Sequence, residues 1–144
     1  MISVEKLLAA KPKGTIWFVT PNEMVIDALN LMAEKNIGAV LVMDGEKLIG
    51  IFSERDYARK GIIQGRKAKS TPVTEVMTSK LFTVTPDMDI EDCMNLFSEK
   101  RIRHLPVMQG DTLLGVLSIG DIVNAIIQEQ STHIQFLEQY ITGR

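Results

Sequence analysis

The sequence predicts a mixed α/β (α+β) fold made of two copies of one strand–helix–strand–strand–helix unit. Three observations predict it: an internal repeat, apolar residues at helical spacing after each V-T-P motif, and two short apolar runs around a turn in each copy. The chain has 144 residues, of which 45% are hydrophobic and 24% charged. Such a length and composition are typical of one soluble globular domain.

The internal repeat appears when the sequence is shifted by 65 residues. Residues 19–59 then align with residues 84–124 without a gap, and 16 of the 41 aligned pairs are identical. A unit of about 60 residues buries little core alone. We therefore expect the two units to pack together about an approximate two-fold axis, with two equivalent clefts between them as natural ligand positions.

The long helix of each unit is predicted from apolar residues spaced i, i+4 and i+7. Asn22 begins the first of these helices and Asp87 the second, because both residue types are good N-caps. The predicted apolar faces are Val25, Leu29 and Met32 in the first unit and Ile90, Met94 and Phe97 in the second.

The strands after each long helix are predicted from apolar runs that flank a turn signal. In the first unit, 37–43 and 48–52 flank Asp44-Gly45, and in the second, 105–108 and 113–117 flank Gly110-Asp111. Short helices follow at about 54–60 and 119–129, with Ser53 and Ser118 as their N-caps.

The segment between the units is basic. Residues 59–72 hold five cationic side chains and no acid, which indicates either a solvated linker or cations that close over an anionic ligand. We expect the first repeat at 8–65, the linker at 66–74, the second repeat at 75–130 and a helical extension at 131–144. Apolar residues from Ile122 onward suit one long helix, or two joined near Ser131-Thr132, with a partner subunit covering the second half.

The repeated element with functional character has the form G-x-x-S-x-x-D. It occurs as Gly50 to Asp56 and again as Gly115 to Asp121. A serine at a helix start lies where backbone N–H groups favour an anion such as phosphate, and an aspartate one turn later can accept hydrogen bonds from ribose hydroxyls. Together these features describe a nucleotide site; the alternative is a capping box that only stabilises the helix.

These motifs resemble a tandem pair of CBS domains, the module named after cystathionine β-synthase. The resemblance rests on V-T-P before each long helix, on I-G-A-V-L-V-M-D-G and I-R-H-L-P-V-M-Q-G across the hairpins, and on both G-x-x-S-x-x-D motifs. It implies a Bateman-type module that binds AMP, ADP, ATP, NAD or S-adenosylmethionine between the repeats. By resemblance, Asp56 and Asp121 hold ribose hydroxyls, and Ser53 and Ser118 lie near phosphate.

The two repeats differ where some AMP-binding relatives carry a His/Arg pair that contacts phosphate. Arg103 and His104 occupy these positions in the second repeat, and the arginine fork is always charged. Gly38 and Ala39 occupy them in the first repeat, where two small residues let an adenine ring approach but supply no charge. The alternative for Arg103 and His104 is a surface pair beside a strand.

The first strand of each unit is a further source of ligand contacts. In the family, residues of this strand reach the cleft built around the other unit's S-x-x-D motif. By resemblance Thr15 bonds the base and Trp17 lines its pocket, although Trp17 is equally suited to the core. The corresponding strand of the second unit offers Thr78, Lys80 and Phe82.

Several function classes are disfavoured by composition and motif. A net charge of −2, from 16 basic and 18 acidic residues, disfavours nucleic-acid binding. Apolar runs of about half a dozen residues are too short to span a bilayer, and the N-terminus lacks the order of a secretory signal, so we expect a cytoplasmic protein. Cys93 is expected to be a small core residue, and no metal or catalytic motif is evident.

The sequence thus predicts a non-catalytic regulatory module for an adenine nucleotide, with AMP as the first candidate ligand. By family analogy two chains form a homodimer, and the output passes to an effector protein that the sequence does not identify. Two alternatives remain open: a constitutive protein–protein adaptor with vestigial clefts, and a weak nucleotide-processing enzyme.

Overall fold

The computed structural model describes residues 2–11 and 16–142, with side chains described up to residue 139. The chain divides into two compact units. One combines Met1–Lys13 with Thr83–Gln109 and Leu114–Arg144, and the other combines Gly14–Phe82 with Gly110–Leu113. We call them the terminal unit and the central unit. Each contains the S-x-x-D motif of one repeat.

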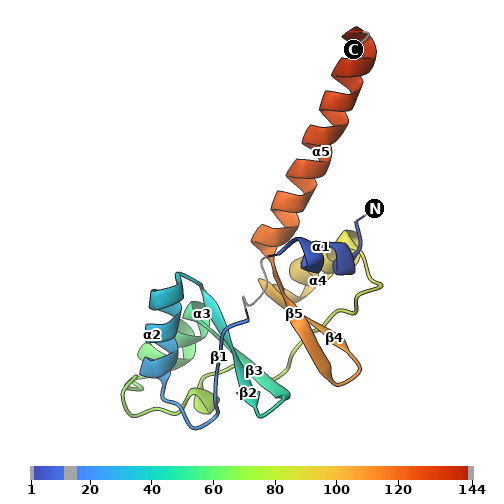
Figure 1. Cartoon of the computed structure of the whole chain (residues 1–144). Helices are drawn as coiled ribbons and strands as arrows, with labels where there is room; N and C mark the ends of the chain where they lie inside the picture. The colour runs from blue at the N-terminus through green and yellow to red at the C-terminus, as the bar shows by residue number, and fades with distance from the viewer. Residues whose placement is uncertain (1, 12–15, 143–144) are drawn as a thin grey trace. The chain divides into compact units, whose positions relative to one another are not determined.

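The central unit is built on a three-stranded sheet (Figure 1). Strand β1 (Phe18–Val19) pairs in parallel with β2 (Ala39–Asp44), which pairs antiparallel with β3 (Lys47–Ser53). Helix α2 (Val25–Lys35) connects β1 to β2, as a parallel pair requires a crossover. The predicted strand–helix–strand–strand order is confirmed in this unit.

Helix α2 begins two residues later than the sequence predicted. Its N-cap is Met24 rather than Asn22, and the Asp27 carboxylate accepts a hydrogen bond of 2.9 Å from the Met24 N–H. The next two N–H groups, of Val25 and Ile26, donate to the carbonyl oxygens of Thr71 and Ala68. The first turn of a helix needs such acceptors, and here the basic segment supplies them.

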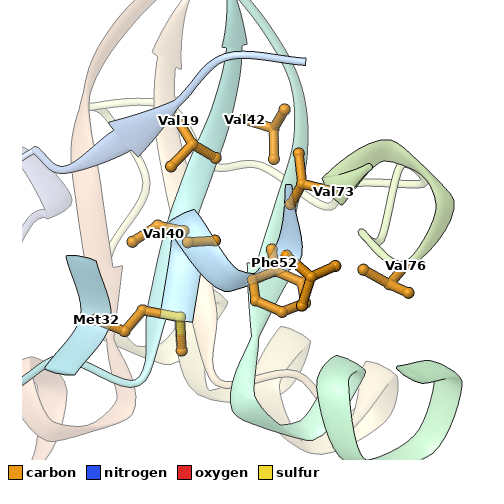
Figure 2. Close-up of a cluster of buried hydrophobic side chains, with 9 residues drawn as sticks. Val19, Met32, Val40, Val42, Phe52, Val73 and Val76 are labelled. Carbon is orange, nitrogen blue, oxygen red and sulfur yellow. The ribbon is translucent and has the colours of Figure 1, made fainter. Parts of the chain in front are cut away.

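The core of the central unit lies between α2 and the sheet, as Figure 2 shows. Phe52 of β3 is fully buried and is surrounded by aliphatic side chains from α2, the strands and the segment after the basic run. That segment contains the short 3-10 helix η2 (Val73–Glu75). The buried cluster consists of Val19, Val25, Ala28, Met32, Val40, Val42, Phe52, Val73 and Val76.

The segment after η2 crosses β3 at Gly50. Ile51 and Thr78 exchange two backbone hydrogen bonds, of 2.9 and 2.8 Å. A Cβ at position 50 would collide with the Met77 side chain and lie 3.1 Å from the Thr78 carbonyl oxygen. Glycine is therefore needed at this crossing, because no side chain would leave room for the neighbouring backbone.

The terminal unit repeats this plan with fewer strand residues. Strands β4 (His104–Gln109) and β5 (Thr112–Ser118) pair, and the predicted first strand is reduced to one parallel bridge between Val84 and Val107. Helix α4 (Ile90–Lys100) begins at Asp89, and not at Asp87 as predicted. Asp89 and Asp92 form a reciprocal capping box, with both hydrogen bonds at 3.0 Å.

The buried face of α4 also differs by one position from the prediction. Cys93 is fully buried beside Ile90 and Phe97, whereas Met94 is 47% exposed. A spacing of i, i+3 and i+7 places these three residues on one face as well as i, i+4 and i+7 would. The expectation that Cys93 is a core residue is confirmed.

The N-terminal helix α1 (Val4–Ala10), which the sequence reading missed, packs in the terminal unit. Its Val4 N–H donates to the Met88 carbonyl oxygen, just as the Val73 N–H donates to that of Glu23 in the central unit. Leu8 covers Gly115 as Met77 covers Gly50. The segment preceding each repeat is therefore grouped with the other repeat's strands, in equivalent ways.

The last helix of each repeat differs most. In the central unit, α3 (Glu54–Asp56) continues as the π-helical turn η1 (Tyr57–Ile62). In the terminal unit, α5 is one continuous helix from Ile119 to Thr142, without a break near Ser131. It packs on α4 and α1, and its C-terminal half extends beyond them (Figure 1). The mixed α/β prediction is confirmed.

Candidate functional site: two aspartates at equivalent helix starts

In the central unit, Asp56 is held by the start of its own helix. Its Oδ2 accepts hydrogen bonds of 3.0 Å from both the N–H and the hydroxyl of Ser53. The Asp56 N–H donates in return to the Ser53 hydroxyl oxygen at 3.1 Å. This is the capping box that the S-x-x-D spacing allows, and it fixes the carboxylate at the end of β3.

The second oxygen of Asp56 faces the crossing segment. Its Oδ1 accepts a 2.9 Å hydrogen bond from the Thr78 hydroxyl and lies 3.5 Å from the Lys60 ammonium. The Lys60 ammonium also donates to the Thr78 hydroxyl oxygen at 3.4 Å. Asp56 therefore has a neutral donor in contact and a cation slightly farther away, and its side chain is only 13% exposed.

Gly38 and Ala39 lie at the same helix start. The Glu54 N–H donates to the Gly38 carbonyl oxygen at 3.1 Å, and Ala39 pairs with Ser53 across the sheet. Gly38 is exposed, and a Cβ built there would meet no atom within 4 Å. The structure thus brings Gly38, Ala39, Ser53 and Asp56 together, with open space in front of Gly38.

In the terminal unit, Asp121 has the same relation to Ser118. The Ser118 N–H donates to Asp121 Oδ2 at 2.8 Å, and the Asp121 N–H donates to the Ser118 hydroxyl oxygen at 3.2 Å. The Ile119 N–H donates to the Arg103 carbonyl oxygen at 3.1 Å, which matches the bond from Glu54 to Gly38. The structure therefore brings Arg103, His104, Ser118 and Asp121 together.

A lysine that the sequence analysis did not single out completes this second site. The Lys11 ammonium, just after α1, donates to Asp121 Oδ2 at 2.9 Å and to the Val116 carbonyl oxygen at 2.6 Å. Both side chains of the ion pair are 26% exposed. Lys11 therefore contacts the same Asp121 oxygen that accepts the Ser118 N–H, whereas Thr78 donates to the opposite oxygen of Asp56.

The charges around Asp121 shift two pKa values. Burial by itself would raise the pKa of Asp121, but hydrogen bonds from Ser118 and the Lys11 ammonium outweigh it, so the pKa lies below its ordinary value. The pKa of His104 is also lowered, first by burial and then by the cations of Lys11 and Arg103, which outweigh the carboxylate of Asp121. The site is therefore built around an ionised carboxylate and a neutral imidazole.

The remaining predicted residues lie elsewhere. Trp17 is partly buried, packs against the core of the central unit, and has the Lys35 ammonium 4.3 Å from its ring centroid. Phe82 is partly buried at the end of the same unit. Thr15 lies outside the described residues. This position fits the core alternative, and the ligand role of Trp17 stays a prediction.

The described residues contain little else that resembles a reactive centre. They include no group of three His, Cys, Asp or Glu side chains that could hold a metal ion. Burial, together with the nearby Asp92 and Asp89, raises the pKa of the Cys93 thiol to about 11, which makes it a poor nucleophile. None of the helices in the described part of the chain is long and apolar enough to cross a membrane.

The role of Lys11 could not be read from the repeat alone. Residue 11 lies before the aligned range of 19–59, so self-comparison gives it no counterpart. A signal is present at a different offset: Val4, Leu7 and Leu8 match Val73, Val76 and Met77 at a shift of 69, and their buried positions agree. An alignment with a four-residue insertion would have shown that this segment is repeated, although not that Lys11 contacts Asp121.

The comparisons with known proteins agree with this architecture. The CBS domain model matches residues 12–62 and again residues 73–128. The chain is 44% identical over 135 residues to CBSX3, a mitochondrial CBS domain-containing protein of Arabidopsis thaliana, covering 90% of this chain and 66% of that protein.

Two solved structures extend the comparison. A protein with CBS domains from Burkholderia ambifaria is 50% identical with a TM-score of 0.85, covering 89% of this chain and 96% of that one. CBSX2, solved in complex with AMP, is 26% identical with a TM-score of 0.75, covering 89% and 98%. With two matches of the family model across most of its length, this chain belongs to the CBS domain family.

Proposed function

We propose that this protein is a non-catalytic regulatory module that binds an adenosine-containing ligand through Asp56 and Asp121 and passes the signal to a separate effector protein. The observation that carries the proposal is the duplicated helix start, in which each S-x-x-D aspartate is held rigid by its serine. The AMP complex of the relative CBSX2 supports an adenine nucleotide as the ligand class.

The ribose of such a ligand fits the chemistry of the aspartates. An ionised carboxylate accepts two hydrogen bonds at once, and bonds to a charged acceptor are the strong ones. At Asp121 the ribose hydroxyls replace the Lys11 ammonium as donors, because Lys11 has a flexible side chain that can move aside. At Asp56 they replace the Thr78 hydroxyl or share the carboxylate with it.

The phosphate of the ligand fits the terminal unit. Lys11, Arg103 and His104 surround the start of α5, where backbone N–H groups already favour an anion. Lys11, once released from Asp121, adds its charge to this group. We propose AMP as the ligand of this site, with Ser118 near its phosphate, and a cytoplasmic homodimer as the working form of the protein.

The constitutive adaptor is the second candidate, and one contact favours it. The Lys11 ammonium already satisfies Asp121 at 2.9 Å, so the carboxylate has a structural partner and needs no ligand. In that function the two aspartates stabilise helix starts, and a partner protein binds whether nucleotide is present or absent.

Isothermal titration calorimetry with AMP, ATP, NAD, S-adenosylmethionine and adenosine separates these functions. The proposal predicts heat with at least one ligand and tighter binding of AMP than of adenosine, because only AMP has a phosphate for Lys11, Arg103 and His104 to contact. Absence of heat with every ligand, for protein freed of co-purified nucleotide, would refute the sensor and favour the adaptor. Product formed from ATP or NAD over hours would refute the non-catalytic assignment.

A further inference from the structure

The C-terminal half of α5 is a helix that its own unit leaves uncovered. From residue 127 to residue 139 every side chain is exposed, and Figure 1 shows this part extending past α1 and α4. An isolated helix of about 12–15 residues is marginal in water. Its stability therefore calls for a partner along one face.

The exposed apolar residues of α5 follow a heptad repeat. Val123, Ile127, Gln130, Ile134 and Leu137 are spaced by four, three, four and three residues. The four apolar members are 46%, 55%, 55% and 44% exposed, in chain order. We call these five residues the α5 seam. In heptad letters, Ile127 and Ile134 are a positions, and the other three residues are d positions. Isoleucine at a together with leucine at d favours a parallel coiled coil of two helices.

The charges beside the seam indicate a second copy of this chain. His133 occupies a g position and Glu138 an e position, five residues later. In a parallel pair of α5 helices each g residue faces the e residue of the partner's next heptad, so His133 of each chain would face Glu138 of the other. An antiparallel pair would instead bring like residues together, His133 with His133 and Glu138 with Glu138.

A membrane surface fits the same face poorly. Helices that lie on membranes carry Lys and Arg on their polar face, whereas the sequence from Ile119 to Thr142 contains neither. Its charged residues are acidic, at positions 121, 129 and 138. Phe136 is also exposed but lies off the seam, so the seam does not account for it.

We propose that the α5 helices of two copies pair in parallel and in register through the α5 seam. The pairing rests on the proposed homodimer and specifies the surface that the two chains share. Gln130 then lies opposite its own copy, where two amides can hydrogen-bond. A single polar pair of this kind fixes register and orientation at some loss of stability.

Cysteine cross-linking tests the register, because Cys93 is fully buried and does not compete. In Gln130→Cys the two thiols face each other, so oxidised glutathione should convert most of the protein into a disulfide-linked dimer. Gln135→Cys is the matched control, because position 135 lies about 130° around the helix from the centre of the seam. This variant should remain monomeric on a denaturing gel. Equal cross-linking of both variants, or none in Gln130→Cys, would overturn the seam.

Light scattering with Ile134→Asp tests the seam without cross-linking. We expect the wild type to show about twice the 16.1 kDa of one chain, and the dissociation constant of the dimer to rise about 30-fold or more in the variant. Gln135→Asp should leave it unchanged. An unchanged dimer in Ile134→Asp would refute the α5 seam as the contact but not the proposed homodimer. AMP binding should be unchanged in both variants, so a change in dimerisation can be told apart from a change in nucleotide binding.

Discussion

Asp56 and Asp121 lie at equivalent helix starts, yet the residues around them differ in charge. Both accept a backbone hydrogen bond from the serine three residues earlier, at 3.0 and 2.8 Å. Asp56 is in contact with the Thr78 hydroxyl, with Lys60 at 3.5 Å. Asp121 is in direct contact with Lys11 at 2.9 Å. The first N–H of the helix that follows each serine donates to the Gly38 carbonyl oxygen in the central unit and to the Arg103 carbonyl oxygen in the terminal unit.

Duplication therefore kept the backbone of the site and changed the charges around it. The capping box, the glycine under the crossing segment and the carbonyl acceptor recur in both units because each is needed to build the helix start. The other side chains around the two aspartates are free of that requirement. We therefore expect the two sites to differ in preference for phosphate rather than in their ability to hold ribose.

The largest expected effect comes from removing either aspartate. Asp121→Ala should weaken AMP binding in the terminal unit about 10- to 100-fold, because hydrogen bonds to a charged group contribute about 1.5–3 kcal/mol. Asp56→Ala should weaken binding of adenosine and AMP equally in the central unit. Calorimetric stoichiometry and affinity of both variants, checked for folding by circular dichroism, measure this.

If either alanine variant binds AMP as tightly as the wild type does, that aspartate does not hold the ribose. Asp→Asn at the same positions serves as the control for capping, since the amide oxygen can still accept the serine N–H while the charge is lost. Loss of binding in Ala but not in Asn would show that the carboxylate charge is not what holds the ribose.

A smaller effect should follow from giving the central unit the cations of the terminal unit. In an Asp121→Ala background, Gly38→Arg with Ala39→His should raise AMP affinity about 5- to 10-fold and leave adenosine affinity unchanged. The space in front of Gly38 admits the new side chain. Gly38→Gln with Ala39→Asn is the matched uncharged control, and an equal gain there would show that charge is not the cause.

The smallest effect concerns the protonation of His104. Burial and the nearby cations lower its pKa, and a bound phosphate would raise it by stabilising the imidazolium. The complex then binds more protons than the free protein, so AMP affinity should rise about two- to threefold as pH falls from 7.5 to 6. Adenosine should show no such rise.

Protonation of the phosphate itself, near pH 6, works in the opposite direction. The comparison of interest is therefore between wild type and His104→Asn titrated over the same pH range. If the two proteins show the same slope of affinity against pH, His104 does not contact the phosphate.

The sequence predicted the repeat, the order of elements and the pairing of Ser53 with Asp56 because these depend on local spacing. It misplaced the starts of α2 and α4 by two residues, since Asn22 and Asp87 looked like caps while the backbone acceptors that decide the start lie far along the chain. The Val25 N–H, for example, uses the Thr71 carbonyl oxygen. Lys11 was missed for the same reason: its partner Asp121 is 110 residues away.

The exchange of the segments that precede each repeat has a consequence for any attempt to cut the chain. A fragment that ends at residue 65, between the two sequence repeats, loses Val73 and Val76 from the core around Phe52. It also loses the Thr78 hydroxyl that donates a hydrogen bond to Asp56. A fragment of residues 16–82 keeps all three. The compact structural unit is therefore out of phase with the sequence repeat, and a single repeat lacks the segment that completes its own core and the surroundings of its aspartate.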